Sequence, residues 1–354
     1  MAQTLEQIPQ PCRITHHLDA RGADGAGVVA HAARLLRAGA LVAFPTETVY
    51  GLGADAGNPT AVAAVYAAKG RPGFNPLIAH VADKAAAVRL VQMTNAAECL
   101  MDAFWPGPLT LVLACGDLDA VCASARAGLT SVAVRVPSHP VARALLRAAE
   151  CPVVGPSANR SGHVSPTQAA HVMADLNGRI DAVLDAGATL VGVESTIVSC
   201  LGLDPVLLRP GGVTRAALAR VLGRPVEDAA PVHAGRPMAP GALASHYAPR
   251  ARVRLDADRV EPGEALLTFA GQHPPGAAQA VEIFDLSPEG DLEQAAARLY
   301  GALRDLDARA VTAIAVAPLP RTGLGEAIAD RLKRAAAPRP GEQKSDGPIS
   351  GPRT

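Results

Sequence analysis

The chain has 354 residues, which predicts one large or two ordinary domains, and 49% of them are hydrophobic, enough for a sizeable core. Its 33 basic and 33 acidic residues give a formal net charge of zero, which excludes a general attraction to nucleic acid or to an anionic membrane. A local basic site is still compatible with this balance. Aromatic residues make up only 3%, so the core must consist mainly of Ala, Val and Leu.

The six cysteines are scattered, without a Cys-x-x-Cys pair, and no histidine cluster has the spacing of a zinc site. This pattern favours free thiols in a reducing compartment and predicts no metal site in the protein itself. The first 21 residues lack the apolar stretch of a signal peptide, and no run reaches the roughly 18 apolar residues of a membrane span. We therefore expect a soluble, cytoplasmic protein that makes no membrane contact.

Residues 1–26 are polar and contain glycine, and we expect a loose leader there. Between residues 27 and 223, short apolar runs alternate with stretches of helical character, which is typical of an α/β domain. The expected helices are 28–37, 60–69, 84–90, 95–104, 140–149, 166–175 and 214–222. The expected strands are 41–44, 77–81, 109–114, 131–136, 153–154, 182–185, 195–199 and 206–209.

Residues 224–250 are rich in Pro, Gly, Ala and His and show no periodicity, which predicts a linker that could also form a lid. Beyond it we expect strands at 251–255, 264–269, 281–286 and 313–317, and helices at 291–306 and 325–336. Residues 251–337 are therefore expected to form a smaller α/β domain with a largely parallel sheet. The tail, 338–354, contains mainly Pro, Gly and charged residues, and we expect it to be disordered.

Two clusters of polar residues follow expected strands early in the chain. Thr46, Glu47 and Thr48 follow strand 41–44, and strand ends are favoured ligand positions in α/β sheets. Lys69 and Arg71 flank a glycine on a tight turn, where Arg offers a fork for two phosphate oxygens and Lys a compact charge. The alternatives are a capping loop in the first case and a solvated turn in the second.

Later clusters repeat this arrangement. Ser157 to Gly162 form a hydroxyl-rich turn, Glu194 to Thr196 precede an apolar run, and Arg209 lies beside a glycine turn. Arg135 interrupts an apolar strand and needs a partner, either an internal carboxylate or the carboxylate of a ligand. Because these clusters supply hydroxyls and cations but no nucleophile–base pair, they favour a site that binds and orients phosphate-bearing and amino-acid-like substrates.

Six motifs occur in order: FPTETVYGL at 44–52, KGRP at 69–72 with NPL at 75–77, WPGPLT at 105–110, SAN at 157–159 with SG at 161–162, ESTI at 194–197 and LRPG at 208–211. Together they resemble the YrdC-like family of threonylcarbamoyl-adenylate synthases over about residues 28–222. The HYAP stretch at 246–249, followed by a second domain, resembles the long, two-domain form of that family.

The resemblance implies a twisted, mixed-sheet α/β domain with an open, concave basic face, and a smaller Rossmann-like C-terminal domain. It implies that L-threonine, bicarbonate or CO2, and ATP condense to threonylcarbamoyl-AMP and pyrophosphate, the first step of threonylcarbamoyladenosine formation in tRNA. The other implied partners are a downstream threonylcarbamoyl transferase complex that acts on tRNA and, weakly, double-stranded RNA. The implied metal is Mg2+ carried by the triphosphate of ATP, with none held by the protein.

The resemblance also implies roles for individual residues. Lys69 and Arg71 would neutralise charge during catalysis, and the motifs leave Ser165 open as an alternative to Thr167, and Thr196 as an alternative to Ser195. Where the family often carries Met with basic or aromatic residues before the His-Tyr pair, this chain has Ala242–Ser245. The implied L-threonine pocket is Thr48, His80, Arg135, Ser157 and Ser195. The implied ATP contacts are Arg71, Asn75, Ser131, Asn159, Thr167, Arg209, His246 and Tyr247.

Two other functions are compatible with parts of the sequence. One is a non-catalytic RNA-binding protein, against which the zero net charge and the few aromatic residues argue. The other is a different carbamoyl-adenylating enzyme, like the domain found in hydrogenase-maturation carbamoyltransferases. Those proteins carry additional cysteine motifs of the zinc-finger type, which this sequence lacks.

Overall fold

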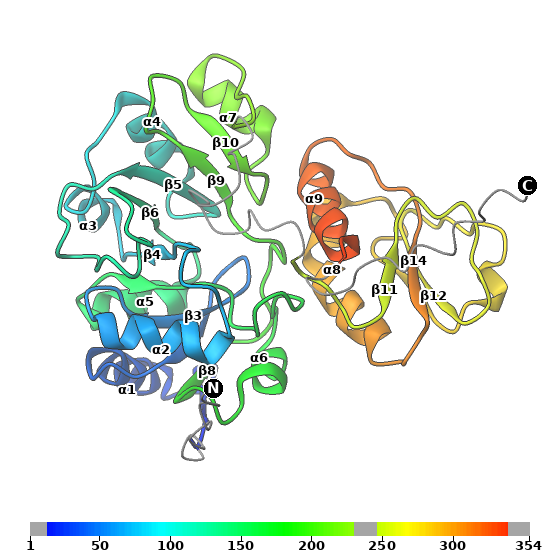
Figure 1. Ribbon diagram of the computed structural model, residues 1–354, viewed down its shortest axis with the longest axis horizontal. Helices are drawn as coiled ribbons and strands as arrows, with labels where there is room; N and C mark the ends of the chain where they lie inside the picture. Colours follow the sequence, from blue (N-terminus) through cyan, green and yellow to red (C-terminus); the bar gives the residue numbers. More distant parts are fainter. Residues whose placement is uncertain (1–12, 230–245, 339–354) are drawn as a thin grey trace, which may run out of the picture.

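The computed structural model describes residues 13–229 and 246–338, which form two lobes (Figure 1). Residues up to 229 build the larger lobe around a ten-stranded sheet, and residues from 246 build the smaller lobe around a four-stranded sheet. The expected leader up to residue 12, linker residues 230–245 and the tail from residue 339 lie outside the described residues. The expected α/β fold with a smaller C-terminal α/β unit is confirmed.

The large sheet is mixed, since β4 runs parallel to β6 whereas β5 runs antiparallel to β6 and parallel to β9. Its strands follow the spatial order β1 (His16–Asp19), β8 (Ala182–Asp185), β2 (Val42–Pro45), β3 (Tyr50–Asp55), β7 (Val153–Val154), β4 (Ile78–His80), β6 (Ser131–Arg135), β5 (Leu109–Ala114), β9 (Thr196–Ser199) and β10 (Val206–Arg209).

The helices of the larger lobe begin and end close to the expected positions, and their caps explain why. Asn58 caps the second helix by accepting hydrogen bonds from the backbone N–H groups of Thr60 and Ala61, and Gly70 ends it in a left-handed conformation. This helix end therefore presents the turn that carries Arg71. The helices are α1 (Gly25–Arg37), α2 (Pro59–Lys69), α3 (Lys84–Val88), α4 (Asn95–Phe104), α5 (Pro140–Ala149), α6 (Ala169–Leu176) and α7 (Arg215–Leu222).

Two strands differ from expectation. Residues 13–26 are not a loose leader throughout, because β1 pairs in parallel with β8. Its side chains are mostly exposed, so backbone pairing rather than an apolar run defines it. Strand β3 was also not expected, since its two glycines interrupt the apolar pattern. A Cβ on Gly53 would lie 2.8 Å from the Val42 carbonyl oxygen and 3.1 Å from the Phe44 ring, so the glycine permits this pairing.

The two faces of the sheet around β5 and β6 have different neighbours. Leu111 and Val134 belong to the main core, which includes residues of α4, whereas Val112 and Ala133 form a small separate cluster with Ile78. Because successive side chains of a strand point to opposite faces, these three residues mark the face away from the main core.

Predicted site residues lie on that face, which we call the second face of the sheet. Ser131 and Arg135 lie two residues before and after Ala133 on β6, and His80 lies two residues after Ile78 on the neighbouring strand. The register pairs His80 with Arg135. The strand alternation therefore brings these side chains to one face of the sheet.

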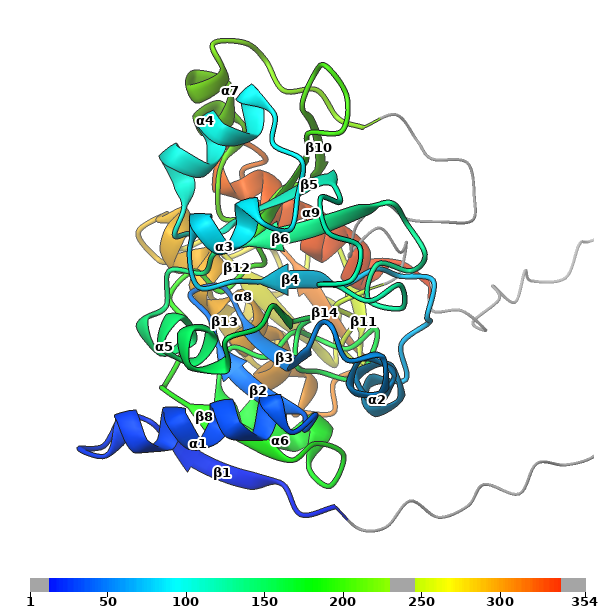
Figure 2. The same ribbon diagram turned by 90° about the vertical axis from the view of Figure 1, so that its left-hand side faces the viewer.

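The smaller lobe contains a parallel sheet in the order β11 (Arg252–Arg254), β14 (Ala313–Val316), β12 (Glu264–Thr268) and β13 (Ile283–Asp285). It also has α8 (Leu292–Asp307), α9 (Leu324–Ala336) and a 3-10 turn at Ala277–Gln279. Both long helices lie on the side of this sheet that faces the larger lobe (Figure 1), and Figure 2 shows the lobe directly behind the large sheet. Every residue of β12 and β14 is buried, as expected of a parallel sheet between covering layers.

The two lobes share one apolar cluster. Val49, Val164 and Val193 of the larger lobe pack together with Tyr247 and with the core of the smaller lobe. The approach is close at Gly192, which has a φ of 74° and where a Cβ would lie 2.4 Å from the Ala296 carbonyl oxygen of α8. An apolar contact of this kind favours a fixed arrangement of the domains over free movement.

Three findings bear on the expected compartment and cofactors. The five cysteines within the described ranges are free thiols. None of the helices in those ranges combines the length and the apolarity needed to cross a membrane. The same ranges contain no group of three His, Cys, Asp or Glu side chains that could hold a metal ion.

Candidate active site

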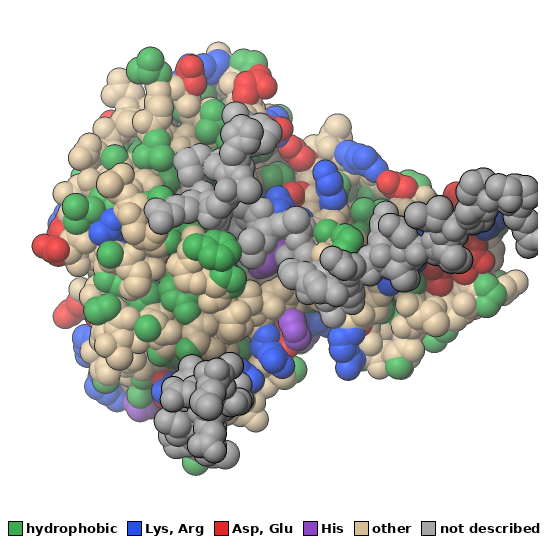
Figure 3. Space-filling view, viewed as in Figure 1, with side chains coloured by type: hydrophobic (Ala, Val, Ile, Leu, Met, Phe, Trp, Pro, Cys, Tyr) green, Lys and Arg blue, Asp and Glu red, His purple; other side chains and the backbone are tan. Residues whose placement is uncertain are grey.

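A cavity of about 40 Å³ lies on the second face of the large sheet, where the two lobes meet. Figure 3 shows His, Lys and Arg side chains gathered along the junction of the lobes. Two hollows of about 530 Å³ lie elsewhere, and neither contains a residue expected in the site. Chemistry rather than size therefore identifies the site. The expected residues that line the cavity are Thr48, Arg71, His80, Arg135, Ser157, Ser195, Arg209, His246 and Tyr247.

The buried guanidinium of Arg135 pairs with the buried carboxylate of Glu47, with 2.8 Å between Nη2 and Oε1. Its Nε also donates to the Gly107 carbonyl oxygen at 3.3 Å. Burial is the largest single influence on the Glu47 carboxyl and would raise its pKa, but the Arg135 charge together with hydrogen bonding holds the pKa below its usual value. Of the two partners considered from the sequence, the structure shows the internal carboxylate. A contact of Arg135 with a substrate carboxylate stays a prediction.

His80 contributes a neutral ring to the cavity wall. Burial, reinforced by the nearby Arg135 charge, lowers its pKa to about 3, so the imidazole is uncharged at neutral pH. The ring packs edge-on against Phe44, with 5.9 Å between the ring centroids. Its Nδ1 is buried and has no hydrogen-bond partner among the described residues. A buried ring nitrogen without a partner, placed on a cavity, is suited to a substrate contact.

Gly155→Ala is expected to weaken L-threonine binding by displacing His80. The new Cβ would lie 2.7 Å from His80 Nδ1 and 3.2 Å from the Phe44 ring, so the imidazole must move. We expect the KM for L-threonine to rise roughly tenfold, equivalent to about 1.4 kcal/mol, with a smaller change in the KM for ATP. Steady-state kinetics of each substrate measure this.

The control for that prediction is the same change in a His80→Ala background. If Gly155→Ala acts through the imidazole, it adds little once the imidazole is absent. Equal losses in both backgrounds would contradict the expectation.

Lys69 does not line the cavity. Its Nζ donates to the carbonyl oxygens of Ser157 and Asn159, the latter at 2.6 Å. Burial, with the neighbouring Arg71 charge, lowers its pKa well below the ordinary value. The ammonium thus fixes the 157–159 loop against the end of α2. Direct charge neutralisation by Lys69 stays a prediction.

Arg71 and Asn75 precede β4 in the chain and Ser131 begins β6, so they belong to the opposite end of these two parallel strands from His80 and Arg135. Arg71 Nη2 donates to the Pro76 carbonyl oxygen at 3.1 Å, and the strand register extended by two residues places Pro76 beside Ser131. Burial lowers the pKa of Arg71 to about 10, which leaves it charged at neutral pH.

The Asn75 side chain is compatible with the expected ATP contact, which stays a prediction. It is fully buried, and neither its Oδ1 nor its Nδ2 has a partner among the described residues. Its backbone is fixed, since its carbonyl oxygen accepts a hydrogen bond from the Tyr66 hydroxyl at 3.1 Å. A buried amide with no partner costs free energy unless a ligand or water satisfies it.

Arg209 and Ser195 form the third side of the cavity. Arg209 donates to the Ser195 carbonyl oxygen through Nε at 3.1 Å and through Nη2 at 2.8 Å. The Ser195 hydroxyl lies 2.8 Å from the Thr110 hydroxyl. Burial lowers the pKa of Arg209. The strand end of β10 is thereby tied to the segment that precedes β9.

Four expected ATP contacts do not line the cavity: Asn75, Ser131, Asn159 and Thr167. Asn159 Nδ2 donates to the carbonyl oxygens of Arg160 and His163, both at 2.8 Å, which leaves only Oδ1 without a partner among the described residues. Thr167 is buried, and its hydroxyl lies 3.4 Å from His171 Nδ1. Contacts of all four residues with ATP stay predictions.

His246 and Tyr247 reach the cavity from the side of the smaller lobe. Their rings meet edge-on with 4.0 Å between centroids, and burial lowers the pKa of His246 to about 3. His246 Nδ1 has no partner among the described residues. Residues 242–245, at which the sequence departs from the family pattern, lie outside the described residues.

Sequence reasoning missed two carboxylates of the site. Glu47 was noted only as part of a polar loop, although the need of Arg135 for a partner could have pointed to it. Glu194 also lines the cavity, and arginine and tyrosine side chains of the smaller lobe contact it. No local pattern in the sequence indicates that second set of contacts.

Two family models match the chain. The model described as "Telomere recombination" matches residues 34–211, and the model described as "Threonylcarbamoyl-AMP synthase, C-terminal domain" matches residues 213–337. Among curated relatives, the threonylcarbamoyl-AMP synthase of Bacillus subtilis is 42% identical over 88% of this chain and 93% of its own length. The enzyme of the same name from Pyrococcus abyssi is 41% identical over 86% of this chain and 93% of its own length.

The fold agrees with solved structures of one of these relatives. The crystal structure of Pyrococcus abyssi Sua5 complexed with L-threonine has a TM-score of 0.82 and 37% identity, and the match covers 91% of this chain and 98% of that chain. A doubly substituted variant of the same protein gives a TM-score of 0.81 at 35% identity, covering 91% and 96% of the two chains. With both family models matched in order, the chain belongs to the threonylcarbamoyl-AMP synthase family, in its two-domain form.

Proposed function

We propose that this protein is an L-threonylcarbamoyladenylate synthase, a nucleotidyltransferase that condenses L-threonine, bicarbonate or CO2, and ATP to threonylcarbamoyl-AMP and pyrophosphate. The observation that supports the proposal is one cavity lined by all five residues expected to bind L-threonine and by four of the eight expected to contact ATP. Relatives with this activity in their names match most of the chain, and one solved relative has L-threonine bound.

The dimensions of the face suit a product with an amino acid at one end and a nucleotide at the other. Ser131 and Arg135 are four residues apart on β6, which corresponds to about 13 Å at about 3.3 Å per residue. Arg135 and His80 would bind threonine at one end, with Thr48 beside them. Arg71 and Asn75 would bind the nucleotide at the other end.

The reaction needs cations and orientation rather than a protein nucleophile. The threonine amine captures CO2 as a carbamate after losing a proton, a carbamate oxygen attacks the α-phosphorus of ATP, and pyrophosphate leaves. Negative charge shifts onto phosphate oxygens, which Arg71 and Arg209 are placed to stabilise from the cavity wall. A buried, fixed arrangement of these donors strengthens that effect.

Mg2+ would arrive with the triphosphate of ATP and supply further charge neutralisation when bound. Arg71 and Arg209 fit such a complex, because they meet the anionic phosphate oxygens and leave the metal to the triphosphate itself. Chelation of Mg2+ is therefore expected to abolish turnover while leaving L-threonine binding intact, which calorimetric titration of L-threonine would show.

The product is a mixed anhydride of a carbamate and a phosphate, and it hydrolyses readily. A downstream threonylcarbamoyl transferase complex that acts on tRNA is the consumer that this chemistry requires. We place the reaction in the cytoplasm, where tRNA is available, and include weak binding of double-stranded RNA as part of the proposal.

Pyrophosphate release with and without L-threonine and bicarbonate tests the function directly. We expect release to depend on both substrates. If neither stimulates release, the proposal is wrong. Salt-dependent RNA binding in the absence of such release would instead favour a non-catalytic RNA-binding protein.

Arg71→Ala is expected to raise the KM for ATP roughly 10- to 100-fold, because charge-assisted hydrogen bonds contribute about 1.5–3 kcal/mol. The KM for L-threonine should change much less, since Arg71 lies at the nucleotide end of the face. Arg220→Ala, an exposed arginine on α7, is the control and should leave both constants unchanged. Equal effects of Arg71→Ala on the two substrates would contradict the separation of the two ends.

A further inference from the structure

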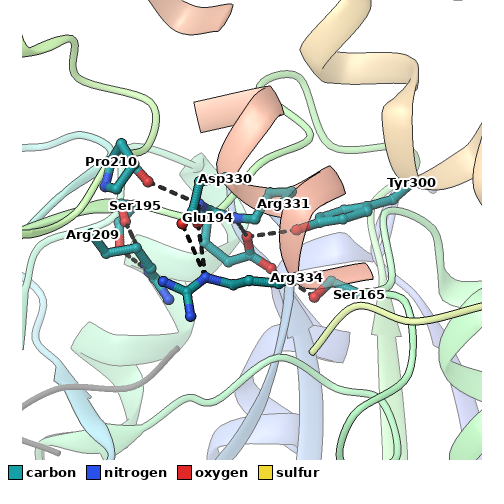
Figure 4. Close-up of polar contacts among 9 residues, drawn as sticks. All are labelled: Ser165, Glu194, Ser195, Arg209, Pro210, Tyr300, Asp330, Arg331 and Arg334. Carbon is teal, nitrogen blue, oxygen red and sulfur yellow. Dashed lines mark hydrogen bonds and ion pairs between the residues drawn. The ribbon is translucent and has the colours of Figure 1, made fainter. Parts of the chain in front are cut away.

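Glu194 is a buried carboxylate that lines the cavity and also joins the two lobes. It lies in the loop between β8 and β9 and is 7% exposed. The Ser165 hydroxyl donates to its Oε1 at 2.6 Å. From the smaller lobe, the Tyr300 hydroxyl of α8 and Arg331 Nε of α9 donate to its Oε2 at 2.8 Å and 2.7 Å (Figure 4). We call these four residues the interdomain clasp.

Glu194 and Arg331 need one another because both are buried. The Arg331 side chain is fully buried, and its Nη1 also donates to the Pro210 carbonyl oxygen at 3.0 Å and to the Asp330 carboxylate at 2.7 Å. Burial would raise the pKa of Glu194, but the Arg331 charge, aided by Arg209, lowers it to about 2. A charge in such a place is tolerated only with its partner present, which fixes the relative position of α9 and the 194–195 segment.

The same two side chains of the smaller lobe both contact the Tyr247 ring. The Tyr300 ring stacks on the Tyr247 ring with 5.7 Å between centroids, and the Arg331 guanidinium lies 5.4 Å from the Tyr247 centroid. Tyr247 has a φ of 62°, a left-handed conformation that residues other than glycine seldom adopt. The contacts with Tyr300 and Arg331 therefore help to maintain this conformation at the cavity wall.

Glu194 connects the clasp directly to the cavity wall. Ser195 follows Glu194 directly, and its carbonyl oxygen receives both hydrogen bonds of Arg209. The His246 N–H donates to the Arg334 carbonyl oxygen of α9 at 3.2 Å. Tyr300 and Arg331 themselves do not line the cavity, but they contact Glu194 and Tyr247, which do.

We propose that Tyr300 and Arg331 of the C-terminal domain are positioning residues of the active site, which set the places of Glu194–Ser195 and of His246–Tyr247 through the interdomain clasp. This role rests on the proposed synthase function. The C-terminal domain is then a part of the catalytic site rather than an appended module.

The test compares full-length variants that differ in which cross-domain contact they lose. Tyr300→Phe removes one donor to Glu194 and keeps the ring that stacks on Tyr247. Arg331→Met removes the buried cation, and the double change with Glu194→Gln removes the orphaned carboxylate charge as well. The matched control is Arg215→Met, which breaks another cross-domain ion pair, Arg215–Glu326, whose Nη2 and Oε1 lie 2.6 Å apart.

We expect the melting temperature of Tyr300→Phe to be close to that of the wild type. Its kcat/KM for L-threonine should fall at least fivefold, with little change in the KM for ATP. The kcat/KM of Arg331→Met for L-threonine should fall at least 50-fold. The double variant should recover thermal stability without recovering kcat. The kcat/KM of Arg215→Met for L-threonine should stay within twofold of the wild-type value. Unchanged kinetics in Tyr300→Phe and the double variant, or an equal loss in Arg215→Met, would overturn the proposal.

Calorimetric titration of L-threonine separates this proposal from the synthase function. A wild-type chain that shows no threonine-dependent pyrophosphate release would refute the function. The clasp would still be supported if the wild type bound L-threonine and Tyr300→Phe bound it at least fivefold more weakly, and refuted if the two bound it equally.

Discussion

Arg135→Ala is expected to remove most threonine-dependent turnover and to lower the free energy of unfolding by about 3–5 kcal/mol, the usual cost of breaking a buried ion pair by removing one partner. The pair joins Arg135 Nη2 to Glu47 Oε1 at 2.8 Å, and their side chains are 4% and 6% exposed. Without the guanidinium, Glu47 stays buried beside neutral groups. The same substitution removes the cation that would meet the threonine carboxylate, so its KM should rise roughly 10- to 100-fold.

The stability loss should depend on pH with a defined sign. In the wild type, Arg135 holds the Glu47 pKa below its ordinary value. In Arg135→Ala the opposing charge is gone, and burial, the largest single influence on this carboxyl, is expected to raise the pKa of Glu47 above its value in the unfolded chain. A group with a raised folded-state pKa contributes stability at low pH and loses it as pH rises through the folded pKa. The gap in melting temperature between variant and wild type should therefore be wider at pH 8 than at pH 5.

The double variant Glu47→Gln/Arg135→Ala separates the structural effect from the binding effect. Replacing both partners removes the orphaned charge, so thermal stability should recover substantially and lose its unusual pH dependence. L-Threonine affinity should not recover, because the cation is still absent. If affinity returned together with stability, Arg135 would serve only to anchor Glu47, and its assignment to the threonine pocket would be wrong.

The outcome at Arg135 shows what a sequence can and cannot decide. An arginine within an apolar strand must have a partner, and that requirement follows from desolvation alone. The partner is set by the pairing of β4 with β6 and by the path of residues 46–50, neither of which a local pattern specifies. Elements with a clear apolar period, such as β5 and α5, begin and end where the sequence predicts.

The failure to predict strands β1 and β3 has physical causes of the same kind. Strand β1 presents mostly exposed side chains, so hydrogen bonding to β8 rather than apolar burial defines it. Strand β3 carries Gly51 and Gly53 because the Phe44 ring occupies the space of their side chains. The first feature depends on a strand that is distant in the sequence, and the second on the packing of the Phe44 ring against two glycines, which a local apolar pattern does not reveal.

The interdomain clasp is the feature of the site that the sequence predicts least. Glu194 and Arg331 are 137 residues apart in the chain, and each looks like an ordinary charged residue in its own segment. The sequence therefore places the six family motifs in one site but says nothing of the support that the second lobe gives to it. That support emerges only from the close packing of α8 and α9 against the 192–195 segment.

Of the glycine-to-alanine substitutions discussed near the site, Gly211→Ala is expected to damage it most. The new Cβ would lie 2.3 Å from the Glu194 carbonyl oxygen, 2.4 Å from the Thr196 nitrogen and 2.5 Å from the Ser195 carbonyl carbon. All three are backbone atoms, so no side-chain rotation can relieve the clash. The 209–211 turn must separate from the 194–196 segment, which breaks the hydrogen bonds between Arg209 and Ser195.

We expect Gly211→Ala to lower the free energy of unfolding by about 1–3 kcal/mol, the range for overpacking. It should also reduce kcat/KM for both substrates, because the broken contacts join Arg209, an expected ATP contact, to Ser195, an expected threonine contact. Thermal melting and steady-state kinetics measure the two effects. Gly301→Ala is the matched control, since this glycine lies within α8 with no atom within 4 Å of the added Cβ. Alanine favours a helix by about 0.5–1 kcal/mol over glycine, so the control should be slightly more stable and fully active. Similar losses in the two variants would show that the Gly211 contact is not what holds the catalytic segment in place.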